Sequence, residues 1–438
     1  MRVVWANTQI LVMMACGLAY ANFCYATEPA GGPPGLKSNP PRTRSELEAE
    51  ARFEESMRAG NYVEAVEAAK FIVLYTMEST ASDDLIAAAL EQLARAQKFS
   101  GELDAAIQNF EASIEYIELG SDRLDRKLVA PLHGLAQILA EKGDFGAAVD
   151  RYARALHITH VNEGPLNLDQ AEILGELVDL YTELGEFDQA RPYQELELSI
   201  YRREYSETDP RVVQAWQRKG RLLTASGEHH QAQQTFEFAM DTMRMSDGND
   251  SLAQIPLLYD LSDSFLRYAV ADKFTRIEMA RSQLDRAASI VERNPDTTAE
   301  QRAAAHLRLG DFMQRYGDWN SALSSYRRAW DCLESELSPE NMRNQVFGEP
   351  VLLSQEPDGD TDPVIASMPG ARRAILVAHD VNKRGRVENA RASQEGEENT
   401  ESLRRTLSHV RAGVYRPRFV DGDPVDTIGI VRRVELTQ

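Results

Sequence analysis

One pattern recurs along two-thirds of the chain and limits what it can fold into. A glycine is followed by a polar or acidic residue, then by a large residue, and five positions after the glycine by an alanine. Six copies place that alanine at intervals of 41, 42, 42, 42 and 90 residues, at Ala65, Ala106, Ala148, Ala190, Ala232 and Ala322. The last interval hides a divergent copy at Ala280, so seven units run from about Ser45 to about Leu337. A fixed period of this length is typical of repeat proteins whose units stack on their neighbours.

Each unit has the residues of two antiparallel helices joined by a turn. In the clearest unit, the small residues Gly310, Ala322 and Ala329 would let the two helices approach closely, and Tyr326 would fill the space between them. Gly317 lies where the first helix should end, a position that commonly needs a left-handed residue. A single hairpin cannot bury its apolar face alone, so the pattern predicts a mostly α fold: a solenoid of about seven helix–turn–helix repeats over residues 45–337.

These units resemble the tetratricopeptide repeat family in its 42-residue form. The unit Leu309–Ala329 carries the small and aromatic residues at the family's offsets, and the unit Leu135–Ala155 repeats them. The resemblance implies a right-handed solenoid whose first helices line a concave groove for a protein or peptide partner. By offset, the groove residues would be Glu91, Arg95, Lys98, His133, Gln137, Glu141, Asp179, Glu183, Gln214, Gln217, Arg221, Asp311, Gln314 and Arg315.

The N-terminal 44 residues have a different composition from the repeats. Arg2 is the only charge in the first 26 residues, and the apolar run Ile10–Ala21 suits the core of a signal peptide better than a membrane span of about 20 residues. We expect residues 1–26 to be a cleaved signal peptide and the protein to be periplasmic, in a Gram-negative-type envelope. The alternative is a retained anchor in the inner membrane. Residues 27–44, with five prolines and three glycines, are predicted to be a disordered linker.

The helical period ends near Leu337, and the composition then changes twice. Residues 338–370 are rich in proline and read as a linker with one strand at Val351–Leu353. Residues 371–438 predict a small α+β domain. Its expected elements are a hairpin of 374–381 and 387–392 with Gly385 in the turn, a helix over 401–411, and a closing strand over 427–436.

This last region resembles the C-terminal domain of TonB-family proteins. Residues 381–387 are similar to that family's hairpin turn, and Tyr415–Val425 is similar to the segment after its helix. Gly413-Val414 replaces the aromatic usual before the Tyr415 position, and the family's leading Tyr-Pro segment is not evident. The resemblance implies a binding module for a second partner in the cell envelope. The alternative it raises is a membrane-anchored transducer of energy to outer-membrane receptors.

Charge narrows the class of partner. The chain carries 69 acidic and 48 basic residues, a net charge of −21, and residues 27–344 account for −20 of it. A face that binds nucleic acid must be basic, so we expect no nucleic-acid partner. A partner of the repeats should instead offer basic or mixed charge.

The sequence shows no motif of an enzyme or of a bound cofactor. Phosphate-binding loops, nucleophile elbows, zinc-protease motifs and paired cysteines are all missing. His157 and His160 share a helical face, but no acid or cysteine in the repeat pattern completes a site around them. We therefore expect a non-catalytic protein with no cofactor and no metal. After signal cleavage Cys332 would be the sole cysteine, expected to be buried and structural.

Overall fold

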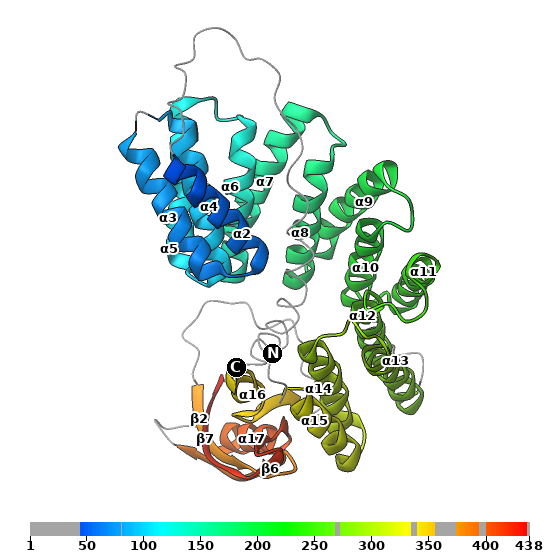
Figure 1. The fold of residues 1–438 in the computed structure, drawn as a ribbon. Coiled ribbons are helices and arrows are strands. Elements are labelled where there is room, and N and C mark those ends of the chain that lie inside the picture. Colours follow the sequence, from blue (N-terminus) through cyan, green and yellow to red (C-terminus); the bar gives the residue numbers. More distant parts are fainter. Residues whose placement is uncertain are drawn as a thin grey trace. The chain divides into compact units, whose positions relative to one another are not determined.

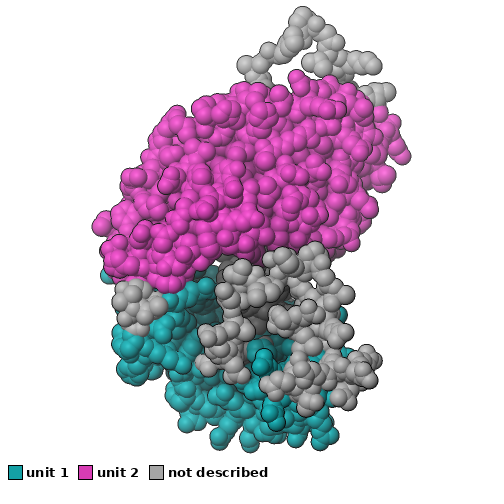
Figure 2. Space-filling model, turned by 180° about the vertical axis from the view of Figure 1, so that it is seen from behind, with its two compact units in different colours: residues 1–15, 249–438 teal, residues 16–248 magenta. Residues whose placement is uncertain are grey.

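The computed structural model describes residues 44–79, 81–267, 272–333, 340–354, 374–393 and 400–435 (Figure 1). The predicted signal peptide, the predicted linker up to residue 43 and most of the linker predicted at 338–370 lie outside these residues. The chain divides into two compact units, residues 16–248 and residues 249–438 together with 1–15 (Figure 2). Among the described residues, no helix combines the length and the apolar character that crossing a bilayer requires.

The first unit consists of helical hairpins in sequence order. A 3-10 turn, η1 (Arg126–Leu128), precedes the third hairpin. The five hairpins are α2 (Arg44–Ala59) with α3 (Tyr62–Glu78), α4 (Asp83–Ser100) with α5 (Leu103–Gly120), α6 (Val129–Glu141) with α7 (Phe145–Glu163), α8 (Leu168–Leu184) with α9 (Phe187–Glu204), and α10 (Pro210–Ala225) with α11 (His229–Asp247).

The second unit begins with two more hairpins, which are α12 (Gln254–Arg267) with α13 (Lys273–Arg293) and α14 (Ala299–Tyr316) with α15 (Trp319–Cys332). The described residues thus contain seven hairpins, and the predicted α-solenoid is confirmed. Residues 268–271, within the connection of the divergent sixth repeat, lie outside the described residues.

The repeated glycine ends the first helix of a hairpin by adopting a left-handed backbone. Its φ is +73° at Gly60, +84° at Gly101 and +77° at Gly185, a region that side chains with a Cβ rarely enter. Gly317 is different, because its φ is −109° and its ψ is −142°. The left-handed turn predicted at Gly317 is therefore wrong. There the second helix is capped instead by Asp318, whose carboxylate accepts the amide N–H of Ser321 at 3.0 Å.

The repeated alanine lies in the packed interior of each hairpin. All seven copies, from Ala65 to Ala322, are fully buried. Small residues also face large ones across the pair: a Cβ at Gly310 would lie 2.6 Å from the ring of Tyr326, and a Cβ at Gly220 would lie 2.4 Å from the ring of Phe236. The predicted pairing of small and aromatic residues is confirmed, and it explains why the repeat keeps these positions small.

The C-terminal region folds as three short sheets and two helices on the last repeat. β2 (Ala374–Val381) lies between β3 (Val387–Ser393) and β7 (Thr427–Glu435), and α17 (Thr400–Arg411) packs on β2 and β3. All four elements agree with the predicted hairpin, helix and closing strand within a residue or so. The core beneath α17 contains Ile375, Val377, Ala390 and Val410.

Part of the segment predicted to be a linker is structured. Helix α16 (Glu340–Phe347), which the sequence analysis did not predict, precedes β1 (Val351–Ser354), the strand that it did. β1 pairs antiparallel with β4 (Val414–Arg416), and β5 (Arg418–Val420) pairs with β6 (Asp423–Val425). Residues 340–354 therefore belong to the folded C-terminal region rather than to a linker.

Candidate functional site: the inner face of the repeats

The first helices of neighbouring repeats contact one another. In the first unit α4 contacts α6, α6 contacts α8 and α8 contacts α10, whereas the second helices pack chiefly on first helices. The first helices therefore form the inner side of the stack. On this inner face Glu141, Asp179, Glu183, Gln214 and Arg221 are exposed, His133 and Gln137 are half-buried, and Gln217 is buried.

A polar network links three successive repeats through Gln137 of α6. The Lys98 ammonium on α4 donates to the Gln137 amide oxygen. The Gln137 amide nitrogen donates to Glu176 Oε1 of α8 at 3.0 Å and lies 3.3 Å from His133 Nε2. The buried Tyr152 hydroxyl donates to Glu176 Oε2 at 3.3 Å. Three of the predicted groove residues, Lys98, His133 and Gln137, are thus brought together.

Burial and nearby negative charge shift the pKa of Lys98 in opposite directions. Desolvation lowers the pKa of its ammonium, and the carboxylates of Glu176, Glu141 and Glu172 offset part of that lowering. Among these three, only Glu141 was a predicted groove residue. Glu172 and Glu176 lie one turn apart on α8 and were not among the predicted groove residues.

A second network, between α8 and α10, includes a buried acid. The Arg218 guanidinium donates to Asp179 Oδ2 at 3.0 Å and also to Glu197 of α9. Glu197 is fully buried, and burial raises its pKa to about 7, with Asp179 adding to the rise and Arg218 opposing it. Arg218 keeps a raised pKa because Asp179 and Glu197 outweigh its desolvation.

Glu197 could have been found from the repeat. It stands at the offset that holds Ala155, Ala239 and Ala329 in other units, so an acid there is out of place in a packed interior. Gly175 makes room for it: a Cβ at that glycine would lie 2.5 Å from Arg218 Nη1 and 2.9 Å from Glu197 Oε1.

In the second unit, the inner face of α14 holds part of the C-terminal region. Gln314 Nε2 donates to the backbone carbonyl oxygens of Arg384 at 2.7 Å and Tyr415 at 2.9 Å. Asp311 accepts the Tyr326 hydroxyl at 2.9 Å and pairs with Arg416 at 3.3 Å. Burial raises the pKa of Asp311, and Arg416 opposes that rise. Two of the three predicted groove residues on α14 are therefore occupied by the chain itself.

Aromatic rings complete this contact. Phe419 of β5 lies 4.9 Å from Phe347 of α16, 5.8 Å from Tyr326 and 6.3 Å from Trp330, between ring centroids. The Arg343 guanidinium lies 4.8 Å from the Trp330 ring. Rings at these separations add attraction beyond the area that they bury, so the C-terminal region is firmly packed on the last repeat.

Comparison with known proteins agrees with the repeat. The family model described as "Tetratricopeptide repeat" matches residues 127–203 and 169–245. The helical hairpins from residue 127 to residue 245 are therefore similar to tetratricopeptide repeats. A search of curated proteins found no significant match.

Several solved structures of tetratricopeptide repeat and related proteins are similar to the chain. A tetratricopeptide repeat protein from Parabacteroides merdae is 17% identical, with a TM-score of 0.47, over 69% of this chain and 98% of that one. The quorum sensor NprR from B. thuringiensis, in its apo form, is 14% identical, with a TM-score of 0.49, over 66% and 76%. A Rap protein complexed with Competence and Sporulation Factor is 18% identical, with a TM-score of 0.44, over 66% and 77%. None of the comparisons indicates an enzyme family.

The remaining predicted groove residues are dispersed over the inner helices of the repeats. Arg95 lies 3.9 Å from the Glu91 carboxylate and 5.6 Å from the Phe53 ring, so it packs within the N-terminal repeats. Glu141, Glu183, Gln214, Arg221 and Arg315 are exposed. The inner face is thus polar and mixed in charge, a surface that can hydrogen-bond an extended chain.

Proposed function

We propose that this protein is a non-catalytic scaffold that binds an extended segment of a protein or peptide on the inner face of its tetratricopeptide repeats. The observation that carries the proposal is the contact of Gln314 with the carbonyl oxygens of Arg384 and Tyr415. There a side-chain amide on an inner helix holds one main-chain carbonyl of the β2–β3 turn and one of strand β4. A bound peptide presents the same main-chain groups.

The exposed inner side chains of the first unit support a partner of basic or mixed charge. Asp179 lies three residues after Glu176, and Glu183 lies four residues after Asp179, so the three carboxylates share one face of α8. Arg221 on the next inner helix adds the opposite sign. A ready-made, rigid row of side chains lowers the ordering cost on the protein's side of a complex.

The proposal also covers where the protein is located and what its C-terminal region binds. The N-terminal apolar run supports export to the periplasm, and the resemblance of residues 371–438 to the TonB C-terminal domain supports a second partner in the envelope. N-terminal sequencing of the mature protein tests this: a chain that begins near Thr27 agrees with export and cleavage. An intact Met1 in the membrane fraction would instead favour the anchored, TonB-like transducer.

The binding surface is tested with selected peptides and paired charge reversals. Peptides are selected from a random display library on the full chain, and their affinity is measured by fluorescence anisotropy. Glu183→Lys, on the inner face, should weaken binding at least tenfold, and added salt should weaken wild-type binding. The control Glu195→Lys makes the same change of charge on the exposed face of the outer helix α9 and should stay within twofold. Equal loss in both variants, or no selectable peptide, would reject the inner face as the binding surface.

A further inference from the structure

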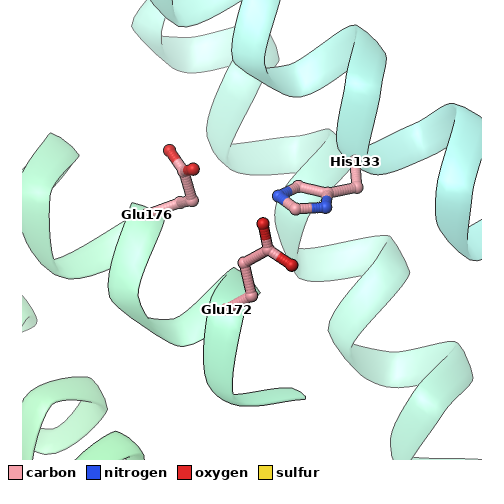
Figure 3. A group of neighbouring side chains, drawn as sticks. All are labelled: His133, Glu172 and Glu176. Atoms are coloured by element: carbon pink, nitrogen blue, oxygen red, sulfur yellow. The ribbon is translucent and has the colours of Figure 1, made fainter. Parts of the chain in front are cut away.

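Three metal-ligating side chains converge on the inner face between α6 and α8. His133 projects from α6, and Glu172 and Glu176 project from successive turns of α8 (Figure 3). One ring nitrogen and one oxygen of each carboxylate all lie within 4.8 Å of one another. Figure 3 shows that the ring nitrogen farther from the backbone faces the two carboxylates. The sequence analysis missed this group because its members come from two repeats.

Gln137 links the histidine to one of the two carboxylates. A lysine ammonium can only donate, so Lys98 must contact the amide oxygen of Gln137, and the amide NH₂ group is turned toward Glu176 and His133. One N–H is given to Glu176 Oε1, and the other lies toward His133 Nε2 at 3.3 Å. His133 Nε2 thus lies beside Glu176 and the Gln137 amide, on the side of the ring that faces the carboxylates. An imidazole nitrogen is a common ligand of transition metals.

The carboxylates are held differently. Both oxygens of Glu176 accept hydrogen bonds, from Gln137 at 3.0 Å and from Tyr152 at 3.3 Å, so this ligand is oriented by its surroundings. Glu172 is exposed and makes no hydrogen bond or ion pair with the rest of the described chain. It can swing inward by the ångström or so that bonds of about 2.0–2.2 Å to one ion demand. Oriented ligands with hydrogen-bonded partners behind them are the usual construction of a protein metal site.

We propose that His133, Glu172 and Glu176 bind a first-row divalent transition metal, with Zn²⁺ as the representative ion. An imidazole nitrogen with two carboxylates suits Zn²⁺ and similar ions, whereas Ca²⁺ and Mg²⁺ prefer oxygen alone. Three protein ligands on an open inner face leave the remaining coordination positions to water. This site goes beyond the proposed scaffold function, because the metal binds without any partner segment.

The ammonium of Lys98 competes with the ion for the same negative charge. Its charge interacts favourably with the carboxylates of Glu176, Glu141 and Glu172. Removal of its charge should therefore tighten metal binding. Lys98→Met keeps the length of the side chain and removes the ammonium, so a several-fold gain in affinity is the expected result.

The repeat itself supplies substitutions that its fold tolerates. The offsets of His133, Glu172 and Glu176 hold Gln217, Gln214 and Gln92 in other repeats. His133→Gln, Glu172→Gln and Glu176→Gln therefore place a residue that the same helical position already accepts. His157→Gln is the matched control, because it removes an exposed histidine from the outer helix α7.

The test is a calorimetric titration of the untagged full chain with ZnCl₂ after treatment with EDTA. Wild type should show a saturable site that millimolar Ca²⁺ and Mg²⁺ do not displace. His133→Gln and Glu176→Gln should each weaken that site at least tenfold, with His157→Gln unchanged. Co²⁺ gives a second readout, since its visible ligand-field bands should appear with wild type and disappear with His133→Gln. Wild-type affinity in all three glutamine variants, or no saturable zinc binding by the wild type and the Lys98→Met variant, would overturn the proposal.

Discussion

The contact between Gln314 and the C-terminal region gives a sharp prediction. Gln314→Ala removes one amide that donates to two carbonyl oxygens, those of Arg384 at 2.7 Å and Tyr415 at 2.9 Å. Gln314 is 6% exposed, so little water replaces the lost donor. A buried acceptor left without a partner costs about 1–2 kcal/mol, and two together cost about 2–4 kcal/mol.

The loss should appear as local opening of the C-terminal region from the last repeat. Native-state hydrogen exchange measures it at the Tyr415 amide, which donates to the Gly385 carbonyl at 2.9 Å. If that bond breaks when the region opens, exchange should accelerate roughly 30- to 700-fold, since about 1.4 kcal/mol corresponds to a factor of ten. Amides in α4 and α6, in the other unit, should keep their wild-type rates.

Arg315→Ala is the control for this experiment. Arg315 is the next residue on α14 and is exposed, so its loss should change the exchange of the Tyr415 amide less than threefold. The reasoning would be refuted if Gln314→Ala left that exchange unchanged while a crystal structure showed both carbonyls without a new donor. It would also be refuted if the two variants gave equal acceleration.

Two further predictions concern the helix contacts and the buried acid. Gly134→Ala places a Cβ 2.4 Å from the Phe110 ring and should lower the free energy of unfolding by about 1–3 kcal/mol. The control Gly146→Ala is exposed in α7 with nothing within 4 Å of the added Cβ, so it should raise the free energy of unfolding by up to about 1 kcal/mol. Urea unfolding followed by circular dichroism measures both variants, and equal effects would contradict the close contact between Gly134 and Phe110. Glu197, with a pKa raised to about 7, holds a proton in the folded state that the unfolded chain releases above its ordinary pKa of 4.5, so its contribution to stability falls as pH rises from 4.5 to 7. Glu197→Gln should match wild type near pH 4.5 and be more stable by about 1–3 kcal/mol at pH 8, and a difference that stays constant over this range would argue against the raised pKa.

The helical repeats could be predicted from the sequence because the residues that define each repeat contact one another within a single hairpin. The alanine and glycine positions control the approach of two helices that are adjacent in sequence, and their spacing is visible without any structure. The same holds for the C-terminal hairpin around Gly385. Gly317 is an exception: like Gly143 it precedes an aspartate that caps the next helix, yet only Gly143 adopts the left-handed backbone, so the residues of the turn do not by themselves determine its conformation.

Contacts between segments far apart in the sequence could not be predicted from the repeat pattern. Asp311 and Gln314 were predicted to face a groove, but nothing in the repeat pattern indicates that β4, about 100 residues later, occupies their place. Helix α16 escaped prediction because it is eight residues long and lies among prolines. The group of His133, Glu172 and Glu176 needs two repeats in register, and an inspection of one helix at a time cannot assemble it.

The residue type at an inner position of one repeat depends on the side chains that the adjacent repeats place next to it. His133, Gly175 and Gln217 share one repeat offset, yet they differ because their surroundings differ. At Gly175 the guanidinium of Arg218 and the carboxylate of Glu197 fill the space that a side chain would need. At His133 the next helix presents Glu172 and Glu176, and a histidine is accommodated between them. The alanine and glycine positions therefore set the architecture, and the chemistry of the inner face is decided by pairs of adjacent repeats. It follows that moving the α6–α7 repeat elsewhere in the stack would keep its fold but separate His133 from Glu172 and Glu176, the partners that give it a chemical role.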